Sequence, residues 1–129
     1  LGYRYLLNGI VVDGEKLGTK IGFPTANINI EESYKLIPKT GVYIITANID
    51  GSAYNGMMNI GFNPTVSGKK QTIEAHLFDF HENLYGKKIT IELLYFLRDE
   101  KKFLSVDELI DQLKIDKENA ISFLANNPS

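Results

Sequence analysis

Cysteine is absent from the 129-residue chain. This absence excludes a disulfide framework and thiolate chemistry, and it makes a reducing cytoplasm the default compartment. Long hydrophobic runs are lacking too, since the longest, such as Leu93–Leu97, are far too short to span a bilayer. No signal peptide is visible. The sequence therefore predicts a cytoplasmic protein without a membrane-spanning segment.

An excess of one charge is also lacking. The 16 acidic and 14 basic residues leave a net charge of -2. The chain therefore lacks the excess of positive charge that favours binding to duplex nucleic acid or to an anionic membrane. Its partners are therefore expected to be small molecules. The hydrophobic share of 43% and the charged share of 23% are ordinary for a globular protein, and the length corresponds to one domain.

Six runs rich in β-branched and aromatic residues predict strands. Gly9 within the first run indicates a bulge. Asp50-Gly51-Ser52 predicts a tight hairpin turn between the third and fourth runs, and the polar, proline-containing segment 61–71 predicts a long loop. The six runs are Tyr3–Val12, Thr25–Ile30, Gly41–Ile49, Ala53–Ile60, Thr72–Phe78 and Lys88–Phe96.

Helical signals follow the sixth run. Ser105 and Glu108 form a capping box, and Leu104 and Leu109 are spaced as a hydrophobic staple around it. Asp116 is positioned to cap a second helix. Strands followed by helices, without alternation, argue against a parallel sheet. The predicted architecture is an antiparallel barrel closed by one or two C-terminal helices.

Glycines recur at every fourth position in one stretch, at Gly14, Gly18 and Gly22. Because glycine accepts positive φ and lets a ligand approach the main chain, such a loop is suited to wrapping an anion. Lys16 and Lys20 would add positive charge. The pattern matches neither the Walker P-loop nor the glycine loop of protein kinases, so the usual phosphate-binding folds are not supported.

Thr25 and Asn27 follow Pro24, where the glycine loop gives way to extended chain. Residues two apart in a strand point the same way, so these side chains present two oxygen ligands to one side. Such a pair suits a hard cation such as Mg²⁺. The competing interpretation is a strand start with turn-prone polar residues, and spacing alone favours it.

Two further residues also have competing interpretations. If the apolar residues of the run Thr72–Phe78 face the core, Glu74 and His76 face outward or into a cleft. A solvated strand face is the simpler interpretation for a glutamate by itself. Arg98 is either an ion-pair partner of the acidic residues that follow it or a clamp on an anionic or planar ligand.

Several segments occur together in an order typical of one known family. They are Gly22–Asn27, Gly41–Tyr43, Asn59–Thr65, Ile73–Phe80, Leu84–Gly86, Leu97–Phe103 and the terminal helix around Leu109 and Asp116. In these segments the sequence resembles, nearly end to end, the riboflavin kinase (flavokinase) family. That family includes the C-terminal domain of bacterial bifunctional riboflavin kinase/FAD synthetases.

The resemblance implies a six-stranded antiparallel Greek-key (split) barrel with one or two C-terminal α-helices, in agreement with the strand order. It also implies transfer of the γ-phosphate of ATP to the ribityl 5′-hydroxyl of riboflavin, giving FMN and ADP. Mg²⁺ would be the cofactor and ATP the co-substrate. The family's threonine and asparagine that handle magnesium and nucleotide phosphates fall on Thr25 and Asn27, and its catalytic carboxylate falls on Glu74.

The resemblance extends to the rest of the site. Nucleotide phosphates are expected at Gly14, Gly18, Lys20, Gly22, Thr25 and Asn27. The substrate-side arginine falls on Arg98, and Tyr85 and Phe103 are the aromatic residues assigned to the flavin, with Phe78 and Phe80 as further candidates for its apolar slot. Many bacterial members carry an arginine where this chain has Thr19, which leaves Lys20 or Lys16 to supply the phosphate-side cation.

The chain begins at Leu1 rather than a methionine, which favours a kinase domain, residues 1–129, excised from a longer two-domain enzyme. The expected partner there is an upstream FMN adenylyltransferase domain. The main alternative is a non-catalytic flavin-binding barrel, which needs neither magnesium nor a base, so the pairing of Thr25 and Asn27 with Glu74 discriminates against it. A third possibility is an interaction module of a larger protein.

Overall fold

The computed structural model describes residues 5–12, 23–30, 38–66, 68–80 and 83–127. These residues form six strands and one helix. The elements are β1 (Tyr5–Val12), β2 (Ala26–Ile30), β3 (Gly41–Ile49), β4 (Ser52–Thr65), β5 (Gly68–Leu77), β6 (Lys88–Arg98) and α2 (Val106–Asn126).

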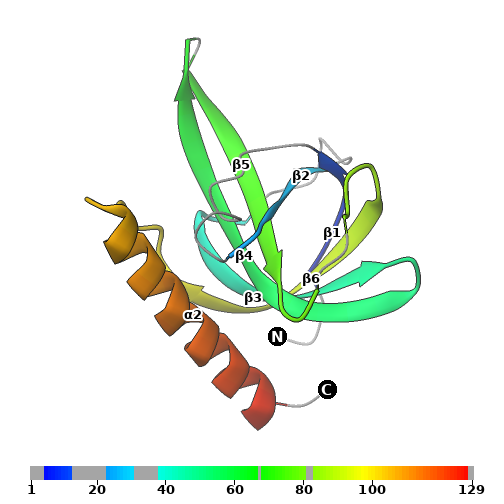
Figure 1. Ribbon diagram of the computed structural model, residues 1–129. Coiled ribbons are helices and arrows are strands. Elements are labelled where there is room, and N and C mark those ends of the chain that lie inside the picture. Colours follow the sequence, from blue (N-terminus) through cyan, green and yellow to red (C-terminus); the bar gives the residue numbers. More distant parts are fainter. Residues whose placement is uncertain (1–4, 13–22, 31–37, 67, 81–82, 128–129) are drawn as a thin grey trace.

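The strands close into a barrel in the order β1-β2-β5-β4-β3-β6, with β6 returning to β1 and every neighbouring pair antiparallel. β3, β4 and β5 follow one another through hairpins, and β2 lies beside β5, which is a Greek-key arrangement. The helix α2, orange to red in Figure 1, lies against the outside of the barrel. The predicted mainly-β barrel with a C-terminal helix is therefore confirmed.

Alternate residues of the strands fill the barrel, because successive side chains in a strand point to opposite faces. In β5 the apolar set Ile73, Ala75 and Leu77 joins the core, as the alternation predicted, and Glu74 and His76 take the outer face. The other strands contribute the buried residues Leu7, Val11, Ile28, Tyr43, Ile45, Ala47, Ile49, Met58, Ile60, Ile89 and Ile91.

A second, smaller core lies outside the barrel wall. Phe23, Val42 and Met57 are buried there, and the partly buried Phe78, Leu97 and Leu113 pack against them. Leu113 belongs to α2 and Val42 and Met57 to neighbouring strands, so this cluster attaches the helix and the chain before β2 to one outer face of the barrel. The candidate site lies on the same face.

Two glycine expectations have different outcomes. Asp50 (φ 52°) and Gly51 (φ 83°) both adopt positive φ between β3 and β4, which confirms the predicted hairpin turn. The bulge expected at Gly9 is wrong, because β1 keeps a regular register with both neighbours there. Gly9 instead allows close approach: a Cβ at this position would lie 2.7 Å from the carbonyl oxygen of Asn29.

The loop predicted over residues 61–71 is also wrong. β4 continues to Thr65 and β5 starts at Gly68, with a continuous register from Ile60↔Ile73 to Thr65↔Gly68. The two strands project beyond the barrel as a two-stranded ribbon, green in Figure 1. Pro64 is tolerated because β3 pairs with β4 only as far as Ile60, so this part of β4 has a free edge where a missing N–H breaks no ladder.

The helix α2 begins as predicted, with the Ser105 side chain accepting a hydrogen bond from the N–H of Glu108 at 3.2 Å. The staple is wrong, because the Leu104 side chain is 97% exposed. Asp116 does not cap a second helix but lies within α2, which runs unbroken to Asn126. Within the described residues, no helix has both the length and the apolarity needed to cross a membrane.

Candidate active site

A row of polar residues crosses three strands on the outer face of the barrel. Asn27 of β2 lies opposite Glu74 of β5, and Asn59 of β4 lies opposite Glu74 on its other side. Residues directly opposite each other in antiparallel strands share a face and lie about 4.5–5.5 Å apart at Cβ. The half-buried carboxylate of Glu74 is thus flanked by two amide side chains.

Thr25 directly precedes β2 and is exposed, two residues before Asn27. The structure therefore brings Asn27 beside Glu74 through strand register and keeps Thr25 close to both through chain continuity. The remaining predicted phosphate-binding residues lie outside the described residues. They are Gly14, Gly18, Lys20 and Gly22, with the alternative cation Lys16.

His76 lies two residues after Glu74 on the same outer face and is 8% exposed. Its Nδ1 lies 2.7 Å from the carbonyl oxygen of Pro24. Since a carbonyl only accepts, Nδ1 carries the hydrogen and donates it. Phe23 and Phe78 meet the imidazole edge-on, with ring centroids 5.5 and 5.8 Å away. Nε2 is buried without a hydrogen-bond partner among the described residues.

The pKa of His76 lies below its usual value of 6.5, chiefly because burial penalises the charged ring. The positive charge of Lys117 on α2 lowers this pKa further, whereas the hydrogen bond to the Pro24 carbonyl raises it. The imidazole is consequently neutral near pH 7, with Nδ1 protonated and Nε2 bare.

Arg98 is the last residue of β6 and binds the side chain of Asp116 on α2. Its Nε donates to Asp116 Oδ1 at 2.9 Å and its Nη2 donates to Oδ2 at 2.7 Å, while Nη1 donates to the carbonyl of Asp99 at 2.9 Å. Gln112 also donates to Asp116 Oδ1, at 2.9 Å. The Asp116 side chain is only 2% exposed, against 19% for Arg98. This buried fork fixes α2 on the end of β6.

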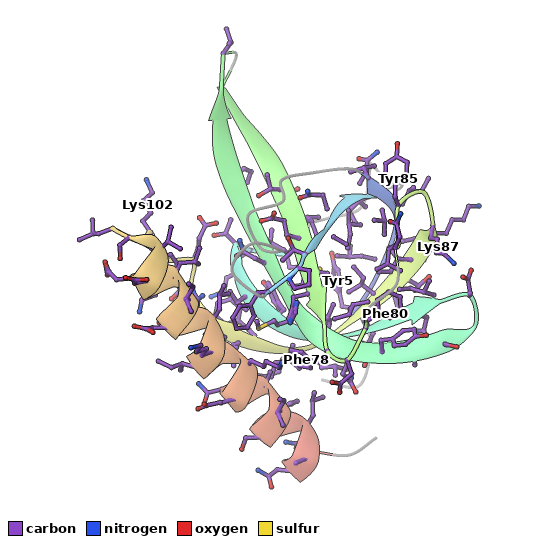
Figure 2. The ribbon with its side chains drawn as sticks, viewed as in Figure 1. Tyr5, Phe78, Phe80, Tyr85, Lys87 and Lys102 are labelled. Carbon is purple, nitrogen blue, oxygen red and sulfur yellow. The ribbon has the colours of Figure 1, made fainter. Side chains whose placement is uncertain are left out.

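The predicted flavin residues do not all come together. Arg98 ends β6 and the half-buried Phe103 follows it in the connection to α2, but the exposed Tyr85 precedes the start of the same strand. In Figure 2, Tyr85 and Lys102, the neighbour of Phe103, lie on opposite sides of the molecule. Phe78 lies near α2, where Lys117 Nζ is 5.7 Å from its ring centroid, whereas Phe80 packs edge-on against Tyr54.

Sequence reasoning missed three features of this region: the position of Asn59 beside Glu74, the His76–Pro24 hydrogen bond and the role of Asp116. The alternation of the run Thr72–Phe78 placed Glu74 on a definite face, but only the register of β4 against β5 makes Asn59 its neighbour. No local signal in the sequence specifies the two side-chain hydrogen bonds, since each joins residues of different elements.

Comparisons with known proteins agree with this fold. The family model described as Flavokinase: Riboflavin kinase matches residues 1–124. The bifunctional riboflavin kinase/FMN adenylyltransferase of Bacillus subtilis (strain 168) is 44% identical over 129 residues, which covers 98% of this chain and 40% of that protein. The chain spans about 40% of the length of the first curated relatives it matches.

Two solved structures are similar to this chain. The crystal structure of riboflavin kinase from Trypanosoma brucei has a TM-score of 0.65 at 26% identity, covering 99% of this chain and 84% of that one. A crystal structure titled as a macrolide-efflux protein from Streptococcus pneumoniae has a TM-score of 0.86 at 36% identity, covering 99% of this chain and 40% of that one.

Replacing Asp116 with alanine is expected to remove about 3–5 kcal/mol from the free energy of unfolding, because the charge of Arg98 loses its buried partner. Urea denaturation followed by circular dichroism measures this loss. Asp111→Ala, at an exposed position on the same helix, is the control and should change stability by less than about 0.5 kcal/mol. A similar small loss for Asp116→Ala would contradict the assigned role of the buried fork.

The neutral state of His76 gives stability a definite pH dependence. Because the pKa is lowered on folding, the unfolded chain binds more protons than the folded one below about pH 6.5, and stability falls as pH falls. His76→Phe should therefore show a smaller decrease in urea midpoint between about pH 7.5 and about pH 5.5 than the unsubstituted protein. Equal decreases in the two proteins would show that His76 titrates alike in the folded and unfolded states.

Proposed function

The chain belongs to the riboflavin kinase family, and we propose that it transfers the γ-phosphoryl group of ATP to the ribityl 5′-hydroxyl of riboflavin, giving FMN and ADP. The observation that carries the proposal is the strand register around Glu74, with Asn27 on one side and Asn59 on the other. A protein that only binds flavin has no use for a carboxylate beside a nucleotide-binding segment.

The chemistry fits a site that mainly positions its reactants. Phosphoryl transfer passes through a loose transition state, so catalysis rests on alignment and on stabilising charge on the phosphoryl oxygens. In our proposal Glu74 orients the ribityl hydroxyl and accepts its proton as the new P–O bond forms. A carboxylate with a solution pKa near ~4.3 is a weak base toward an alcohol, but the proton needs to move only late in the reaction.

The residues present suit Mg²⁺, although they do not form a full set of protein ligands around it. The described residues contain no cluster of three or more His, Cys, Asp or Glu side chains able to hold a metal. Mg²⁺ commonly keeps several waters and takes one or two protein ligands together with substrate phosphates. The exposed Thr25 hydroxyl and the Asn27 amide would supply that donor set, and the bound ion would neutralise charge on the phosphates.

The flavin would bind from the opposite side of Glu74. Arg98 and Phe103 are proposed to contact it, with Arg98 held in place by Asp116 and still able to offer the face of its guanidinium. Tyr85 lies at the other end of β6. For Tyr85 to contact the same flavin, either the ligand would have to extend along the length of that strand or the chain would have to move. We also propose that the chain is the kinase part of a longer enzyme, since its curated relatives are named as bifunctional with an FMN adenylyltransferase.

Incubation with riboflavin, ATP and Mg²⁺ should yield FMN, separable by chromatography, and Glu74→Gln should reduce kcat by about 10²–10⁴-fold. Riboflavin affinity should be unchanged, since the glutamine keeps the size of the side chain. Glu118→Gln, at an exposed position on α2, is the control and should be fully active. Turnover of Glu74→Gln within a few-fold of the unsubstituted protein would exclude Glu74 as the base. Absence of FMN with folded protein would favour the flavin-binding alternative.

Thr25→Ala is expected to weaken binding of Mg-ADP while leaving riboflavin binding unchanged, because only the nucleotide half of the site loses an oxygen ligand. Isothermal titration calorimetry with each ligand separates the two effects. Thr25→Ser keeps the hydroxyl and should restore most of the Mg-ADP affinity. Equal Mg-ADP affinity in Thr25→Ala and the unsubstituted protein would rule out the metal assignment.

A further inference from the structure

The backbone pairing between β2 and β5 ends inside the predicted nucleotide-binding segment, Pro24–Asn27. It consists of Asn27↔Glu74 and Ala26↔Ala75 in the described register, and continuation would bring Thr25 opposite His76. Pro24 has no N–H to donate and its fixed φ disfavours a regular ladder. The main chain therefore cannot by itself hold the start of this segment against β5.

The side chain of His76 makes the connection that the main chain lacks. Nδ1–H donates to the Pro24 carbonyl at 2.7 Å, one residue beyond the last backbone pair on β5. The ring is held by Phe23 and Phe78, which meet it edge-on. A donor with so little freedom fixes the position of the carbonyl as well as binding it.

One strand thus carries two functions at adjacent outward positions. Glu74 faces the proposed phosphoryl acceptor, and His76 holds the residue that precedes Thr25. We propose that His76 is a positioning residue which sets the start of the nucleotide-binding segment, Pro24 and Thr25, at a fixed place relative to Glu74. This inference rests on the proposed function, and it assigns His76 no contact with substrate.

The bare Nε2 supports a role for the Nδ1 bond rather than for packing alone. Nε2 has no hydrogen-bond partner in the part of the chain that the structure describes, and a buried acceptor without one disfavours the folded state. A phenylalanine would fill the same aromatic site without that penalty. The hydrogen bond to Pro24 is what an imidazole provides here and an apolar ring does not. Removing it should leave the fold intact and loosen the segment on which Thr25 and Asn27 lie.

The test compares three variants of the protein. His76→Phe keeps the aromatic ring and removes the donor. His76→Asn carries an amide N–H close to the position of Nδ1 and should rescue function partly. Met57→Ala opens the same apolar cluster without touching the hydrogen bond, and so reports what loosened packing does by itself. Thermal unfolding of each variant establishes that it is folded at the assay temperature.

For His76→Phe we expect Mg-ADP affinity, measured by calorimetry, to fall about five- to tenfold, the loss typical of one neutral hydrogen bond. The kcat/KM for Mg-ATP should fall by at least as much, whereas KM for riboflavin should stay unchanged. His76→Asn should recover at least half of the lost affinity on a logarithmic scale. Met57→Ala should lower the melting temperature without a selective effect on the nucleotide.

A spectroscopic measurement tests the geometry without any activity. The chain has two histidines, so a ¹⁵N–¹H correlation spectrum of the imidazole rings, with the His76 signals identified by their absence in His76→Phe, reports which nitrogen is protonated. We expect the Nδ1–H tautomer near neutral pH. An Nε2–H tautomer, which has no hydrogen on Nδ1 to donate to the Pro24 carbonyl, would overturn the proposal.

The inference and the proposed function fail in different ways. Suppose that the unsubstituted protein forms FMN and that His76→Phe shows the same Mg-ADP affinity and the same kinetic constants. His76 is then not a positioning residue. The same conclusion follows if Met57→Ala reproduces the selective nucleotide effect or if His76→Asn rescues nothing. If no FMN forms, the proposed function fails, and the calorimetric comparison decides the role of His76 for nucleotide binding alone.

Discussion

The closure of the barrel between β2 and β5 is the constraint on which the site depends. β3, β4 and β5 pair with their sequence neighbours, but β2 meets β5 only after the whole β3–β4 hairpin has intervened. The free energy gained by such a non-local pairing must offset the entropy lost on closing a long loop. Because Asn27 and Glu74 lie opposite each other at this seam, closing the barrel and assembling the candidate site are one event.

Two side-chain hydrogen-bond systems join elements that backbone pairing does not connect at these points. His76 holds Pro24, and Arg98 holds Asp116 on α2. Both connect different elements, and both pair one buried polar group with a partner from another part of the chain. In such low-dielectric surroundings each bond tolerates little displacement, because a broken bond leaves a polar atom or a charge without water. These hydrogen bonds therefore fix the positions of the residues that they join more closely than apolar packing does.

Local chemistry made much of this fold predictable. The Asp50-Gly51 turn, the Ser105 cap and the alternation in β5 all depend on residues close together in sequence, and all three expectations are confirmed. The errors concern partners far apart. The apparent loop around Pro64 is a strand because β5 pairs with it. Asp116, expected to cap a second helix, lies within α2 and binds Arg98 at the end of β6. The outward position of Glu74 was predictable. Its pairing with Asn59 was not, because the loop expected over residues 61–71 left the β4–β5 register undetermined.

The ribbon formed by the ends of β4 and β5 has a consequence for how the molecules behave at high concentration. Beyond Ile60 on β4 and before Glu74 on β5, the pairings described leave the outer edges of both strands open. Open edges invite pairing with another chain. Pro64 removes one main-chain donor from these edges. The proline that made this segment resemble a loop thus disfavours the pairing of these two strands with a third.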